Sequence, residues 1–189
     1  MSKLSDRPKT LKVSDFKHYL NDEIQLGYYQ EINVAGSTEK EVGAFYNSFL
    51  RDVFTKKQKF RVDVEARVAE RMNQKKADFA ILYVRLGVPK RVILFEYKRS
   101  EFASRGAEWA AALQQAVDYC KLVRDTESDP DKTLYITVNI GTYLRFYEIP
   151  PLSSAVKDWA PGGGVVYELA DDESKVWELW LLLRDQVMQ

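Results

Sequence analysis

Two apolar segments joined by a short turn constrain the fold of this chain more than any other feature of its sequence. Residues 77–84 and 91–98 are rich in aliphatic and aromatic side chains, and Gly87 lies between them. This pattern predicts an antiparallel β-hairpin. Residues at equal distances from the turn face each other in such a hairpin, so a turn centred on Gly87 places Asp78 opposite Glu96.

The predicted hairpin also brings an ammonium group to the same place. Side chains alternate between the two faces of a strand, so Glu96 and Lys98 share one face and Tyr97 lies on the other. Two carboxylates and one ammonium group therefore converge at the end of strands that are otherwise apolar. Burying such charges is costly unless a partner or a metal ion compensates them. A salt bridge of Lys98 with one carboxylate is the simpler interpretation, and a metal site is the functional one.

Hydrophobic periodicity places the other elements of the chain. A helix N-cap at Ser37 or Thr38 precedes apolar residues at spacings of three and four, which predicts a helix. The expected order is a helix over 39–54, strands over 60–68, 77–84 and 91–98, a helix over 104–124, a strand pair over 134–140 and 143–149, a short strand over 165–169 and a helix over 174–187. We therefore expect an α/β fold in which helices flank a mixed central sheet of order α-β-β-β-α-β, with extra C-terminal strands and a helix.

Length and composition favour one domain. The chain has 189 residues, and 46% of them are hydrophobic, which is enough apolar material for one core. Residues 1–36 are polar and are expected to form an N-terminal appendage, while residues 37–189 form a single domain. Cys120 is the only cysteine, which excludes an internal disulfide framework. Neither a signal peptide nor a membrane-spanning segment is recognisable, so we expect an intracellular protein, cytoplasmic or nuclear, without a membrane partner.

The distribution of charge is compatible with an anionic partner. The chain carries 28 basic and 28 acidic side chains, so its formal net charge is zero. Residues 51–105 nevertheless carry 15 basic and 7 acidic side chains, while residues 106–189 carry 7 basic and 14 acidic ones. A basic middle segment can hold a polyanion if its side chains share one face. A solvated basic surface is the other interpretation.

The residues of the hairpin resemble a known nuclease motif. Lys76-Ala77-Asp78, followed on the next strand by Glu96-Tyr97-Lys98, resembles the PD-(D/E)XK superfamily of restriction-endonuclease-like nucleases. The order of helices and strands over residues 37–149 agrees with a restriction-endonuclease-like core. The resemblance implies that Asp78 and Glu96 bind a divalent metal ion, with the Tyr97 carbonyl as a further ligand. It also implies that Lys98 orients or activates the attacking water and neutralises the phosphate. Ala77 stands where the family often has proline.

Two further features extend the resemblance. Gln115 and Tyr119 are similar to the Gln-x-x-x-Tyr element of the RecB and lambda-exonuclease branch, which implies that Gln115 acts in the active site and Tyr119 contacts substrate. Their spacing puts them on one helix face, which an ordinary packing face would also explain. Many relatives use an acidic residue of the first helix as a metal ligand. Glu39 lies near the apolar stripe of that helix and is preferred over Glu41, although both can simply interact with the helix dipole.

These features together predict a nuclease that cleaves DNA with Mg²⁺ or Mn²⁺. Carboxylate oxygens suit these ions, and the lack of a His/Cys cluster argues against zinc. The expected contacts to the nucleic-acid backbone are Arg99, Arg105, Lys75 and Lys76. An inactive nuclease-fold module that binds nucleic acid or protein, of the effector or toxin type, is the main alternative, and an RNA-directed nuclease is another. The apolar C-terminal helix makes a homodimer conceivable.

Overall fold

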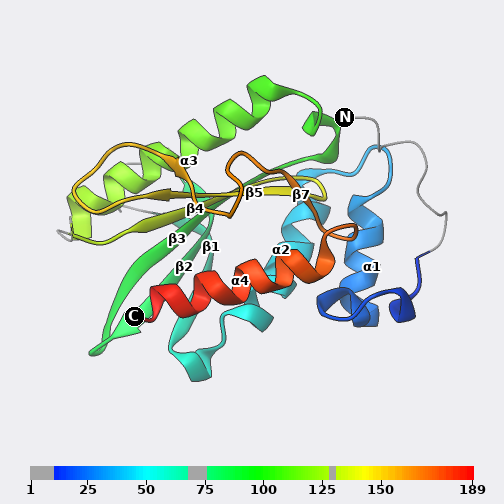
Figure 1. Cartoon of the computed structure of the whole chain (residues 1–189), viewed down its shortest axis with the longest axis horizontal. Coiled ribbons are helices and arrows are strands. Elements are labelled where there is room, and N and C mark those ends of the chain that lie inside the picture. Colours follow the sequence, from blue (N-terminus) through cyan, green and yellow to red (C-terminus); the bar gives the residue numbers. More distant parts are fainter. Residues whose placement is uncertain (1–10, 68–75, 128–130) are drawn as a thin grey trace.

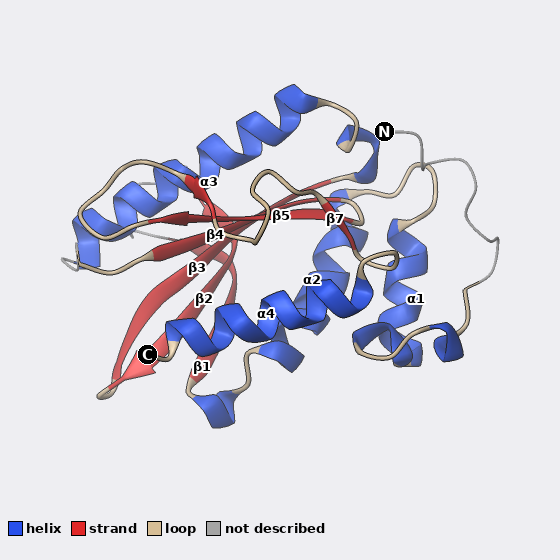
Figure 2. Ribbon diagram, viewed as in Figure 1, coloured by secondary structure: helices blue, strands red, loops and turns tan. Residues whose placement is uncertain are grey.

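The computed structural model describes residues 11–67, 76–127 and 131–189, and these form an α/β fold around a mixed sheet (Figures 1 and 2). Seven strands build the sheet in the order β1-β2-β3-β4-β5-β6, with β7 also paired to β5. The helices are α1 (Glu23–Ile32), α2 (Glu39–Val53), α3 (Gly106–Glu127) and α4 (Glu173–Val187). The strands are β1 (Phe60–Arg67), β2 (Lys76–Arg85), β3 (Val88–Lys98), β4 (Leu134–Ile140), β5 (Tyr143–Ile149), β6 (Lys157–Asp158) and β7 (Tyr167–Glu168). The predicted α/β class with helices flanking a mixed sheet is confirmed.

The sheet separates two apolar layers. α3 crosses from β3 to β4, which makes this pair parallel, while the other pairs in the sheet are antiparallel. α3 covers one face of the sheet, and α2 and α4 pack against the other (Figure 1). The apolar stripe of α2 is completely buried there, as its spacing predicts. The ends of β2 and β3 are thus enclosed by helices on both sides.

The β2–β3 hairpin has the predicted register. Phe79 pairs with Phe95 and Ile81 with Ile93, so residues at equal distances from Gly87 do face each other near the open end. Leu86 and Gly87 form the turn with φ angles of 52° and 79°. Two positive φ angles are typical of a two-residue turn whose twist matches that of the flanking strands. The turn pairs Arg85 with Val88, and this register alone would place Asp78 opposite Phe95. The β-bulge between Ile81 and Leu82 shifts the pairing by one residue and thereby brings Asp78 opposite Glu96.

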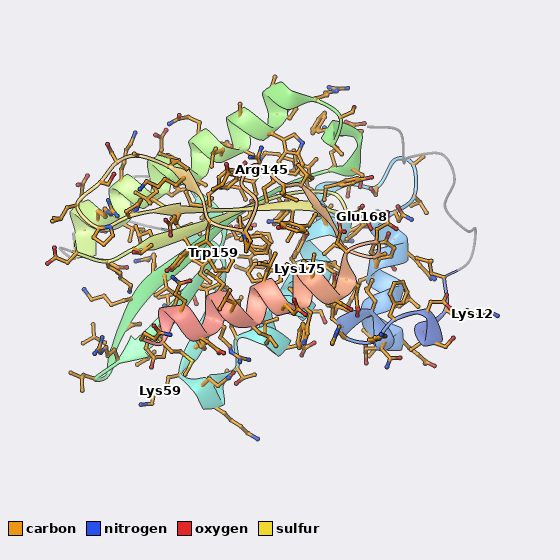
Figure 3. The ribbon with its side chains drawn as sticks, viewed as in Figure 1. Lys12, Lys59, Arg145, Trp159, Glu168 and Lys175 are labelled. Atoms are coloured by element: carbon orange, nitrogen blue, oxygen red, sulfur yellow. The ribbon has the colours of Figure 1, made fainter. Side chains whose placement is uncertain are left out.

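The N-terminal segment is part of the domain and not an appendage over its described residues. Leu20, Leu26, Tyr29 and Ile32 are buried in the core that α2 and α4 share. The Tyr29 hydroxyl donates a hydrogen bond to the buried carboxylate of Glu168 at 3.0 Å. Figure 3 labels Glu168 near the start of α4, beside α1. Although apolar residues are sparse in this polar segment, they are sufficient to hold α1 in place, because they are buried where α1 packs against α2.

The C-terminal helix packs inward. Val176, Leu179, Trp180 and Leu183 are buried, whereas Leu182 is 54% exposed. Most of the apolar surface that made a homodimer conceivable is therefore used within the chain, and dimerisation through α4 stays a prediction. No helix of the described part of the chain has the length and apolar character needed to cross a membrane.

Candidate functional site

The open end of the β2–β3 hairpin brings the acidic residues together. The backbone ladder ends at Phe79 and Phe95, and the next donor of β3, the Tyr97 N–H, bonds to Asp78 Oδ2 at 2.8 Å. The carboxylate of Asp78 thus takes the place of a backbone acceptor. Its charge interacts with Glu96 and Lys98, so all three groups lie within electrostatic reach of one another.

Glu96 has one satisfied and one unsatisfied carboxylate oxygen. Lys98 Nζ lies 3.6 Å from Glu96 Oε2, and the Glu96 side chain is only 3% exposed. Oε1 is buried without a hydrogen-bond partner in the described structure. Buried polar atoms in folded proteins almost always have a partner. A hydrogen bond with Asp78 favours the protonated form of Glu96, so the two carboxyl groups are close enough to share either a proton or a cation.

The electrostatics of the site oppose two ionised carboxylates. Burial, followed by the negative charge of Asp78, raises the pKa of Glu96 to about 8, and Lys98 offsets part of this effect. Burial also raises the pKa of Asp78, although the Tyr97 N–H and Lys98 lower it. The pKa of the Tyr97 hydroxyl rises to about 12 through burial and the surrounding carboxylates. A divalent cation would relieve this repulsion, because it favours the ionised form of both carboxylates.

The N-terminus of α2 adds a third acidic residue to the surroundings. Gly43 lets Tyr97 pack closely on α2, since a Cβ atom at Gly43 would lie 2.7 Å from the Tyr97 hydroxyl oxygen. Glu39, one turn earlier, raises the pKa values of Asp78 and Tyr97 through its charge. Glu41 instead accepts the Thr38 backbone N–H at 2.7 Å and completes a capping box. The geometry therefore favours Glu39 over Glu41 as the acidic neighbour of the site.

The other predicted residues are dispersed. The Gln115 side chain is exposed and makes no hydrogen bond within the described residues, whereas Tyr119 is buried in the core between α3 and the sheet. Their shared helix face does not make them equivalent, because Tyr119 lies nearer the centre of the buried face. Arg99 and Arg105 are exposed on the connection from β3 to α3. Lys75 lies outside the described residues, and Lys76 is the first residue of β2.

Two residues that lie near the site were not predicted from the sequence. Glu65 on β1 lies opposite Asp78, because its neighbours pair with Phe79 and Ala77. Its φ is 46°, and its charge reaches Tyr97. Residues 68–75 between the two strands lie outside the described part of the chain, and alternation along each strand did not by itself define their pairing. Asn139 Nδ2 on β4 donates to the Glu96 carbonyl at 3.3 Å, and a polar residue in a strand that is otherwise mostly apolar was a usable signal.

The donor set is compatible with a hard divalent cation but is not a complete metal cage. Within residues 11–67, 76–127 and 131–189, no group of three or more His, Cys, Asp or Glu side chains is placed to hold a metal ion. Asp78 and Glu96 provide two carboxylates. Asp78 Oδ2 accepts the Tyr97 N–H, and the buried Glu96 Oε1 accepts no hydrogen bond from the described residues. Mg²⁺ commonly binds through one or two carboxylates and keeps several waters, so two protein carboxylates fit such an ion.

Comparisons with protein-family models, with curated proteins and with solved structures give no match for this chain. The geometry of the site is therefore the main basis for assigning a function.

The free energy of unfolding of the metal-free protein is expected to fall as the pH rises from about 4.5 to about 8. Glu96 has a higher pKa in the folded than in the unfolded chain, so the folded state binds more protons in this interval. The stabilisation is complete below the unfolded pKa and is lost as the pH passes the folded one. Urea unfolding in EDTA at several pH values measures this slope.

The matched variants isolate Glu96 in that measurement. Glu96→Gln is expected to flatten the pH dependence and to be more stable than the wild type above the folded pKa. Glu178→Gln changes an exposed carboxylate paired with Lys175 and should leave the slope unchanged. An unaltered slope in Glu96→Gln would contradict the electrostatic description of the site.

Proposed function

We propose that this protein is a metal-dependent nuclease that hydrolyses phosphodiester bonds of DNA at Asp78, Glu96 and Lys98. The observation that carries the proposal is the pairing of the buried Glu96 carboxyl group with that of Asp78, with the Lys98 ammonium group 3.6 Å from Glu96 Oε2. An ion pair that only stabilised the fold would not need a second buried carboxylate with a raised pKa. The resemblance to restriction-endonuclease-like nucleases agrees with this assignment of roles.

Asp78 and Glu96 would hold a Mg²⁺ or Mn²⁺ ion, and the resemblance implies the Tyr97 carbonyl and an acidic residue of α2, here Glu39, as additional oxygen ligands. When bound, such an ion polarises the scissile phosphate and lowers the pKa of a coordinated water. The Tyr97 N–H orients Asp78 by its hydrogen bond to Oδ2, so the carboxylate is held before any ligand arrives. This orientation reduces the reorganisation needed when the substrate binds.

Lys98 supplies the positive charge of the mechanism. Its ammonium group lies on the same strand face as Glu96 and is partly buried, so its field is less screened than that of a surface lysine. In this position it stabilises the negative charge that develops on the phosphate oxygens during attack by water. It also holds Glu96 toward its ionised form, which keeps that carboxylate available to a cation.

The direct test is cleavage of nucleic acid. We expect the purified protein to cut plasmid or single-stranded DNA when Mn²⁺ or Mg²⁺ is added, and to stop in EDTA. Asp78→Asn is expected to abolish cleavage, because it removes one of two carboxylates at the site. Asp63→Asn is the matched control, since Asp63 pairs with Arg61 on the edge strand β1.

The same assay separates the alternatives. Cleavage of structured RNA with no cleavage of DNA would make the protein an RNA-directed nuclease. Binding of either nucleic acid without cleavage under both metals would favour an inactive nuclease-fold module. Cleavage that persists at full rate in Asp78→Asn would show that another site, or a contaminant, is responsible and would refute the proposal.

A further inference from the structure

The connection from β3 to α3 carries two cations on one aromatic ring. The guanidinium carbons of Arg99 and Arg105 lie 5.0 Å and 4.9 Å from the centroid of the Phe102 ring. Cation–π attraction holds each guanidinium group in place. Two like charges near one ring also repel each other, and a bound anion would reduce this repulsion.

This connection is anchored at both ends. The Ser100 hydroxyl donates to the Ile32 carbonyl at 2.9 Å and accepts from Ser37. The indole N–H of Trp109 donates to the Ala103 carbonyl at 2.9 Å. Because its backbone is held at both places, the segment presents Arg99 and Arg105 with little freedom, and less entropy is lost when they bind a ligand.

The position of this pair links it to the proposed active site. Arg99 follows Lys98 directly, so its backbone starts within one residue of the candidate catalytic lysine. Both arginines are exposed, and Arg105 has no ion pair among the described residues. Arg99 contacts the Glu101 carboxylate at 3.2 Å, in a pair of which both side chains are about half exposed. Exposed ion pairs are weak, so a phosphate can displace Glu101.

We propose that Arg99, Phe102 and Arg105 form a binding site for a backbone phosphate next to the phosphodiester bond held at Asp78, Glu96 and Lys98, an inference that rests on the proposed function. The two guanidinium groups are the ligands, and Phe102 is a positioning residue. Guanidinium groups occupy the space over the Phe102 ring, so the ring does not stack on bases. Binding at this site is therefore sensitive to salt and indifferent to base identity.

The test measures the affinity for labelled oligo-dT and oligo-dA of about 20 nucleotides in EDTA, over about 50 to 200 mM salt. Arg105→Gln is expected to weaken binding about tenfold, because a hydrogen bond to a charged group is lost. It should also reduce the salt slope by about 0.7 for a single strand. Glu101→Gln is expected to act in the opposite direction and tighten binding, since it removes the competitor for Arg99.

Phe102 is tested by a pair of variants and a double-mutant cycle. Phe102→Leu is expected to weaken binding several-fold, whereas Phe102→Tyr keeps the ring and should bind like the wild type. Combined with Arg105→Gln, Phe102→Leu should add less than its separate effect, because the residue that it positions is already gone. Arg61→Gln, on the edge strand β1, is the matched control and should change the affinity little. Melting curves of each variant identify those that do not fold. If the Phe102 variants do not fold, the Glu101 and Arg105 variants, which are remote from the core, still test the phosphate site.

The outcomes separate this inference from the proposed function. Wild-type protein that binds both oligonucleotides while Arg105→Gln, Glu101→Gln and Phe102→Leu leave its affinity and salt slope unchanged would overturn the phosphate site alone. A preference for one base composition that is lost in Phe102→Leu would also overturn it, because the ring would then be stacking on bases. Wild-type protein that neither binds nor cleaves nucleic acid would overturn the proposed function together with the site.

Discussion

Replacing Lys98 by alanine is expected to reduce the rate of metal-dependent DNA cleavage by about 10²- to 10³-fold, the effect of removing one group that stabilises transition-state charge. The ammonium group is partly buried and lies 3.6 Å from Glu96 Oε2, so no solvent cation replaces it effectively. Its loss also raises the pKa of Glu96 further, because Lys98 now lowers it. Cleavage rates measured at saturating Mn²⁺ and DNA isolate the effect on the chemical step.

The controls for Lys98 separate charge from general damage. Lys121→Ala removes a lysine on the exposed side of α3, which pairs with Asp118, and should cleave at the wild-type rate. Lys98→Arg retains a positive charge with a different shape and should recover part of the rate. A Lys98→Ala protein that cleaves as fast as the wild type would remove Lys98 from the mechanism, and a loss reproduced by Lys121→Ala would point to an unspecific effect.

Replacing Trp180 by alanine is expected to lower the free energy of unfolding by about 3–5 kcal/mol, the usual effect of deleting a large buried aromatic side chain. Trp180 is completely buried between α4 and the sheet. Its ring lies 5.1 Å from Phe146, 5.7 Å from Phe49 and 6.2 Å from Phe95, measured between centroids. The variant therefore leaves a cavity at the centre of the larger apolar layer. Urea unfolding followed by circular dichroism measures the loss.

Two further substitutions in α4 sharpen this test. Trp180→Phe keeps an aromatic ring and removes a buried indole N–H that has no hydrogen-bond partner among the described residues, so it should cost much less than alanine. Leu182→Ala deletes a leucine that is 54% exposed and should change the stability by less than about 0.5 kcal/mol. A Leu182→Ala protein as unstable as Trp180→Ala would mean that α4 packs differently, or that its outer face lies in an interface.

The close approach of Asp78 and Glu96 was predictable from the sequence because it depends on local geometry. The turn at Gly87 sets the register of the hairpin to within one residue, and alternation along β3 places Lys98 beside Glu96. The β-bulge between Ile81 and Leu82, which the sequence did not predict, supplies the last residue of that register. The strand pair around Gly141 was predictable for the same reason. The sequence likewise predicted α2, α3 and α4 but not α1, and of the two candidates Ser37 and Thr38 it is Thr38 that caps α2.

The properties that make the hairpin end a candidate site depended on the tertiary structure. Burial raises the pKa of Glu96, and no local pattern reports how deeply a strand end is covered. The choice of Glu39 over Glu41 depends on the contact between α2 and Tyr97. The position of Glu65 depends on the pairing of β1 with β2. The sequence alone determined which residues neighbour one another along turns and strands, since those rules act over a few residues. Only the folded chain decided burial, charge environment and the seating of α1, because these depend on segments far apart in sequence.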